Sequence, residues 1–163
     1  MLQSAFKCKT MKPIRIHLTV FMSLVLVSGL TAFPLRTEIR FLHLHQDIFP
    51  PFLVLWINEV YEAIGQCPDL MLYGTDWLAF AHFIIALFFI PVFIDPFRYK
   101  LNLKIGMLAS LLVFPLAFIC GPIRGIPLFH QVIDCCFGVL GFLYLSVILL
   151  KINKLQHTHE NHH

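Results

Sequence analysis

The sequence predicts an all-α integral membrane protein: a bundle of four membrane-spanning helices with an additional amphipathic interfacial helix in the first outer loop. Apolar residues make up 58% of the 163 residues and charged residues only 13%. A soluble domain carries roughly 25% charged residues, because its surface faces water. The apolar residues are also concentrated in four long segments. The composition excludes disordered chains, coiled coils and nucleic-acid-binding proteins, which all need more polar or more basic sequence.

Four segments are long enough to cross the hydrocarbon core of a bilayer, which takes about 20 apolar residues in a helix. They run over residues 14–33, 76–94, 101–120 and 128–150. Each must be helical, because lipid offers no hydrogen-bond partner for the backbone. We expect residues 1–156 to form a single transmembrane domain and the His-rich residues 157–163 to be a disordered tail.

The loop after the first span carries a pattern of its own. Within residues 52–65, polar residues such as Asn58, Glu59 and Glu62 recur at helical spacing, and apolar residues cover the remainder. A Pro-Pro pair precedes them and sets a sharp helix start. The pattern predicts an amphipathic helix lying in the outer membrane interface.

The direction of the chain follows from its basic residues, because Lys and Arg in short loops stay on the cytoplasmic side. Nine of the twelve lie before the first span or at its start, between the second and third spans or at the start of the third, or after the fourth. The other side holds Arg36, Arg40 and Arg124 together with most of the acids. Both termini are therefore expected in the cytoplasm. The first span also fits a secretory signal peptide, and whether it is cleaved stays open.

Ionisable residues in the spans are the candidates for function, since a charge at the bilayer centre costs roughly 2.5–3.5 kcal/mol. They share helix faces with small residues, which mark close helix approach in lipid. These faces carry Ala79 and Ala86 in the second span, Gly106, Ser110, Ala117 and Gly121 in the third, and Gly138 and Gly141 in the fourth. The candidate residues are Asp76, His82, Arg124, His130 and Asp134, with Gln131 at a similar depth.

Two interpretations of these residues remain open. They form either a polar pocket at the outer face, suited to an anionic headgroup, a quinone ring or a proton path, or a structural set. In the structural set, Arg124 and Asp134 make an interhelical ion pair and His82 bonds to a neighbouring carbonyl.

Metal and cofactor sites have weaker support. His43, His45 and Asp47 would share one face of an extended segment, and imidazole suits zinc, copper or iron, but solvated loop histidines explain them as well. A b-type haem needs two axial ligands, for which His82 and His130 are the available pair. The sequence predicts neither a metal nor a cofactor and no catalytic residue. It also lacks the local signatures of serine hydrolases, zinc proteases and NTP-dependent enzymes.

Three runs resemble a family of small bacterial multi-span integral membrane proteins: YGTDWLAFAH (73–82), IDPFRYK (94–100) and GPIRGIPLFHQVIDCCFG (121–138). The resemblance covers about the last three spans. It implies a place in the bacterial cytoplasmic membrane and lends no activity. It also implies aromatic and basic residues at the positions of His130 and Gln131, which makes Arg124 and Asp134 the better candidates.

The leading functional expectation is a non-enzymatic subunit or scaffold of a membrane complex, or a homo-oligomer. Its partners would be the lipid bilayer and a membrane protein or a second copy of the chain, with no nucleic acid. One alternative is a lipid- or quinone-binding protein, conceivably an enzyme, with a polar pocket at the outer leaflet. The other is a transporter or proton-conducting protein, which needs polar residues throughout the membrane depth.

Overall fold

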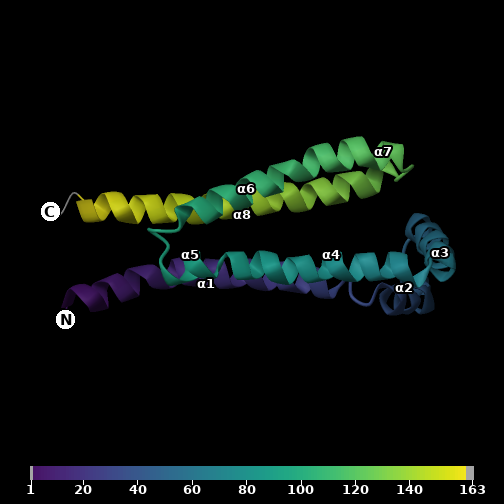
Figure 1. Ribbon diagram of the computed structural model, residues 1–163, viewed down its shortest axis with the longest axis horizontal. Coiled ribbons are helices and arrows are strands. Elements are labelled where there is room, and N and C mark those ends of the chain that lie inside the picture. The colour runs from purple at the N-terminus through teal and green to yellow at the C-terminus, as the bar shows by residue number, and fades with distance from the viewer. Residues whose placement is uncertain (1, 161–163) are drawn as a thin grey trace. The chain divides into compact units, whose positions relative to one another are not determined.

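The structure, a computed structural model, describes residues 2–160 (Figure 1). Within these residues every regular element is a helix. Four helical segments are long and apolar enough to cross a membrane: Met11–Leu30, Asp69–Ile94, Lys100–Ile123 and Leu128–Thr158. The all-α fold class is thereby confirmed, and the chain is an integral membrane protein by the length and composition of its helices.

The first and fourth spans are continuous helices, whereas the second and third are interrupted. α1 is Leu2–Leu30 and α8 is Leu128–Glu160. The second span consists of α4 (Asp69–Phe88) and α5 (Ile90–Ile94). The third consists of α6 (Lys100–Pro115), a π-helical turn η2 (Leu116–Cys120) and α7 (Gly121–Ile123).

Proline accounts for both interruptions. Pro91 has no N–H to donate to the carbonyl four residues earlier, so α4 ends at Phe88 and a new helix starts at Ile90. Pro115 closes α6 in the same way, and the chain continues in π-helical geometry. The helices of the second and third spans extend beyond the predicted limits. The second begins at Asp69 rather than at residue 76, and the third runs from Lys100 to Ile123 rather than over 101–120.

The segment between the first and second spans is a helical hairpin, α2–α3. α3 (Pro51–Gln66) confirms the helix expected over residues 52–65. It is preceded by α2 (Leu35–Leu44) and the short 3₁₀ helix η1 (Gln46–Ile48), in a region that the sequence analysis treats as loop. α2 and α3 pack against each other, and each has one isoleucine in the core, Ile39 and Ile57. Burial of these side chains stabilises a helix too short to persist alone.

The chain divides into two compact units, Met1–Phe21 with Phe88–His163, and Met22–Leu87. In the first unit, α6 and α8 lie side by side (Figure 1). The large side chains buried there include Leu103, Leu145, Ile148 and Ile152. In the second unit, the buried residues include Ile39 and Ile57 of the α2–α3 hairpin and Ala79 and Ala86 of α4.

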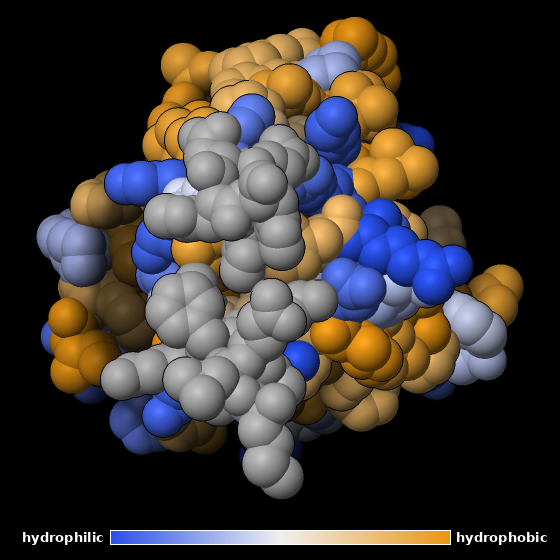
Figure 2. Space-filling model, turned by 90° about the vertical axis from the view of Figure 1, so that its left-hand side faces the viewer, coloured by the Kyte–Doolittle hydropathy of each residue, from blue (hydrophilic) through white to orange (hydrophobic). Residues whose placement is uncertain are grey.

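Polar contacts join helices at the end of the first unit that carries both chain termini. The Lys151 ammonium donates to Nε2 of His17, and Nδ1 of His17 lies 3.2 Å from the Tyr144 hydroxyl. Lys100 donates to Asn153 at 2.8 Å and also to Gln156. Figure 2 views the molecule from this end, where hydrophilic side chains stand among apolar ones.

The C-terminal part of α8 is longer than expected. The helix continues through His157 to Glu160, within a segment for which the sequence analysis expects disorder. The Thr158 hydroxyl donates to the Lys154 carbonyl at 2.9 Å, a bond typical of a formed helical turn. Residues 161–163 of the expected tail lie outside the described residues.

Candidate functional site

Small residues bring α6 and α8 into close contact. A Cβ atom on Gly138 would lie 2.7 Å from the Ser110 carbonyl oxygen, and one on Gly141 would lie 2.9 Å from the Ser110 hydroxyl. On α6, a Cβ atom on Gly106 would lie 2.9 Å from the Leu145 side chain. The small-residue faces predicted for the third and fourth spans therefore face each other, as close helix packing in lipid requires.

A second close approach surrounds His82 in the other unit. A Cβ atom on Gly29 of α1 would lie 2.8 Å from both the Ala79 carbonyl oxygen and the Cβ atom of His82. The Nδ1–H group of His82 donates to the Leu78 carbonyl at 3.0 Å. Leu78 lies one turn earlier on the same helix, so this bond joins no second helix. Asp76 is half-buried on the same helix, seven residues inside the second span rather than at its rim.

The three candidates near the connection of the last two spans differ in burial and position. Arg124 is exposed and follows α7, where its backbone N–H donates to the Cys120 carbonyl at 3.0 Å. His130 and Asp134 are half-buried, one helical turn apart on α8. Within residues 2–160, no ion pair joins the side chains of Arg124 and Asp134, so the expected interhelical pair is not formed.

The residue that holds this connection is Gln131. Its side-chain nitrogen donates to the Ile126 carbonyl at 2.7 Å, and the residue is only 5% exposed. A Cβ atom on Gly121 would lie 2.6 Å from the Gln131 side chain, so glycine is what admits it. The sequence signal for a bond to the turn is an amide side chain in an apolar segment directly after a Gly/Pro-rich turn. Without the structure, this signal names no partner for Gln131.

The five predicted site residues divide between the two units. Asp76 and His82 belong to Met22–Leu87, and Arg124, His130 and Asp134 belong to the other unit. A common pocket of all five stays a prediction.

The weak metal candidates do not share a face as expected. His43 and His45 lie at the C-terminal end of α2, where residues two apart point in nearly opposite directions, and Asp47 lies in η1. Nδ1 of His43 donates to Oδ1 of Asn58 at 2.9 Å, whereas Nδ1 of His45 donates to the Phe41 carbonyl at 2.9 Å. The expected extended segment is therefore wrong, because this segment is helical.

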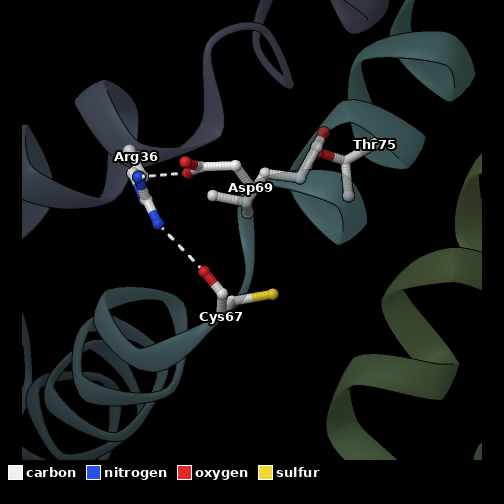
Figure 3. A network of polar contacts seen from close by, with 5 residues as sticks. Arg36, Cys67, Asp69 and Thr75 are labelled. Atoms are coloured by element: carbon white, nitrogen blue, oxygen red, sulfur yellow. Dashed lines mark hydrogen bonds and ion pairs between the residues drawn. The ribbon is translucent and has the colours of Figure 1, made fainter.

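Arg36, for which the sequence predicts no partner, lies at the start of the α2–α3 hairpin. Nη1 of Arg36 lies 2.8 Å from a carboxylate oxygen of Asp69, and its Nη2 donates to the Cys67 carbonyl at 2.9 Å (Figure 3). These two bonds tie the start of α2 to the residues that lead into α4. We refer to them as the Arg36 clasp.

Beside the clasp, a groove of about 260 Å³ opens between α2 and α3. Its walls are Arg36, Thr37, Ile39 and Arg40 on α2 and Tyr61, Ile64 and Gly65 on α3. The groove combines two cations with an apolar floor, so it suits an amphiphilic anion. Glu38, on α2 but not among the lining residues, is partly buried, and this burial raises the pKa of its carboxyl group.

Comparison of the chain with protein-family models, with curated proteins and with solved structures gives no match. The resemblance to small bacterial membrane proteins, and the bacterial cytoplasmic membrane that it implies, stay predictions.

Proposed function

We propose that this membrane protein is a non-enzymatic subunit or scaffold, which acts by packing its helices against a larger membrane complex or against further copies of itself. The proposal is carried by one observation: three polar side chains within the spans bond to carbonyls of their own helices. His82 bonds to Leu78, Ser110 to Gly106 at 3.0 Å and Ser146 to Phe142 at 2.7 Å. A side chain that bonds to its own helix leaves no unsatisfied polar group facing lipid, so the helix surface is free to pack against lipid or protein.

The outer face of α8 supplies a surface for such packing. Phe137, Leu140 and Leu143 are each more than half exposed within the described chain, and they recur at helical spacing. In a membrane these side chains contact either acyl chains or another protein. Their face is separate from the Gly138 and Gly141 positions, which are already in contact with α6.

The proposal includes an orientation, with both termini in the cytoplasm of a bacterial cell. Support comes from the basic residues of the first unit, where Lys12, Lys104 and Lys154 are exposed and Lys100 and Lys151 bond only to uncharged groups within the described residues. Such clusters stay on the cytoplasmic side.

Photo-crosslinking in native membranes tests the contact surface. We expect a photoreactive amino acid at Leu140 to give a crosslinked product of defined mass, either a dimer or a complex with one protein partner. The same residue placed at Ile148, which is buried on α8, is the matched control and should crosslink only within the chain.

Native mass spectrometry in mild detergent completes the test. A homo-oligomer, or a complex with a protein of defined mass, supports the proposal. A monomer that retains a lipid or a quinone, with no crosslink at Leu140, contradicts it and favours the alternative of a lipid- or quinone-binding protein.

A further inference from the structure

We infer that the groove between α2 and α3 binds the phosphate group of an anionic phospholipid. This inference is independent of the proposed function, because it concerns one site in the α2–α3 hairpin and requires no protein partner. It follows from the donors that face the groove, their fixed positions and the apolar surface beneath them.

The donors are two guanidinium groups one helical turn apart. Arg36 and Arg40 stand at positions i and i+4 of α2, so their side chains are neighbours on one face. Each guanidinium has five N–H bonds. Arg36 uses two of its groups in the clasp, and Arg40 has no hydrogen bond or ion pair within residues 2–160. An anion between them would replace cation repulsion with charge-assisted hydrogen bonds.

No acidic side chain lines the groove. Asp69 is bound to Arg36 on the side of the clasp, which leaves the Arg40 charge without an acidic partner in the described chain. The hydroxyl-bearing side chains of Thr37 and Tyr61 complete the polar part of the wall. This composition is complementary to one phosphate group.

The walls of the groove are held in place before any ligand arrives. Asp69 and the Cys67 carbonyl fix Arg36 (Figure 3). On the other wall, the Tyr61 ring stacks on His43, with ring centroids 4.1 Å apart and an angle of 5° between the planes. His43 is in turn bonded to Asn58. Such pre-organisation lowers the conformational entropy lost on binding.

The remaining surface favours a lipid over free phosphate. Ile39, only 5% exposed, and Ile64 form the apolar part of the groove, and Gly65 has no atom within 4 Å of the position that a Cβ atom would take. The same hairpin exposes Phe41, Leu44 and Leu55, each at least 60% exposed. A hairpin between two membrane spans that combines these features can hold a headgroup and contact its acyl chains.

The test is a titration of the full chain in neutral detergent, followed by native mass spectrometry. Dihexanoyl phosphatidylglycerol, dihexanoyl phosphatidylcholine and inorganic phosphate are added in separate arms. We expect the phosphatidylglycerol to bind most tightly, and Arg40→Gln to raise its dissociation constant by about tenfold or more, as loss of a charge-assisted contact does. Gly65→Trp fills the groove without changing the charge and should weaken binding to a similar extent.

Lys104→Gln is the matched control, because it removes one exposed cation from the other unit. Binding by Lys104→Gln at the wild-type level, with Arg40→Lys retaining more affinity than Arg40→Gln, supports the site. Wild-type affinity in Arg40→Gln overturns it, as does an equal loss in Lys104→Gln. Inorganic phosphate bound as tightly as the lipid also overturns it. Oligomer mass is read from the same spectra, so failure of the proposed function is seen separately.

Discussion

The carbonyl oxygen of Ser110 lies 2.7 Å from the position that a Cβ atom on Gly138 would occupy. The obstacle is backbone rather than a flexible side chain, so a larger residue forces α6 and α8 apart. We expect Gly138→Val to lower the free energy of unfolding by roughly 1–3 kcal/mol, as overpacking does. Unfolding in detergent, followed by circular dichroism, measures the effect.

The control for this change is Gly74→Ala. No atom lies within 4 Å of a Cβ atom there, so the helix should be unaffected or slightly stabilised. Equal stability of Gly138→Val and the wild type would show that α6 and α8 do not approach as closely as described.

A second prediction concerns the connection between the last two spans. Gln131→Leu keeps a side chain of similar size but removes the donor to the Ile126 carbonyl. We expect a loss of about 0.5–1.5 kcal/mol, the usual net contribution of one hydrogen bond. Amide hydrogen exchange should accelerate in residues 121–127. Gln66→Leu, at an exposed position at the end of α3, is the control and should leave that exchange unchanged.

A third prediction concerns the α2–α3 hairpin. Asn58→Leu removes the acceptor for His43 and with it a side-chain hydrogen bond between α2 and α3. We expect α2 to exchange its amide hydrogens faster while the first and fourth spans keep their rates. The effect should be absent in Glu59→Leu, because Glu59 is exposed on the same helix. Unchanged exchange in Asn58→Leu would mean that α2 is held by its other contacts, such as the Ile39 and Ile57 packing and the Arg36 clasp, without this hydrogen bond.

A fourth prediction concerns the pH dependence of the hairpin. Burial raises the pKa of Glu38 above its ordinary 4.5, so the folded state binds its proton more tightly than the unfolded state. The hairpin therefore loses stability as pH rises from 4.5 through the raised pKa. Glu38→Gln should remove this loss and make the hairpin more stable at neutral pH.

The measurement is the exchange rate of α2 amides at pH 4 to 7, corrected for intrinsic exchange. Glu59→Gln removes a carboxyl group from an exposed position of the same hairpin and controls for the charge change. If Glu38→Gln and the wild type show the same pH profile, burial of this carboxyl does not affect the hairpin.

The spans could be predicted from the sequence because length and apolar composition alone are what a bilayer requires. The faces of Gly106, Ser110, Gly138 and Gly141 could be predicted as well, because helical spacing already places small residues together. α2 was missed because it is only 10 residues long and depends on packing against α3. His43 and His45 show the consequence, since the angle between their side chains depends on the secondary structure assigned to them.

The groove was missed for a different reason. Arg36 is 33 residues from Asp69, and His43 is 15 residues from Asn58. Local spacing in the sequence does not predict contacts at such separations. Arg36 and Arg40 are therefore recognisable from the sequence only as two basic residues, not as parts of a groove. For Arg124 and Asp134 the sequence suggests a contact that the described residues do not show, because two opposite charges near one turn can point in different directions.

The Arg36 clasp also makes the α2–α3 hairpin a closed loop. Because Arg36 at the start of α2 bonds to Asp69 at the start of α4, the two ends of the segment between the first and second spans are joined. Extra residues inserted in η1 would enlarge this loop at a small entropic cost, which grows only with the logarithm of its length. Arg36 and Asp69 would stay bonded, so the hairpin can change in length while its two ends keep their contact.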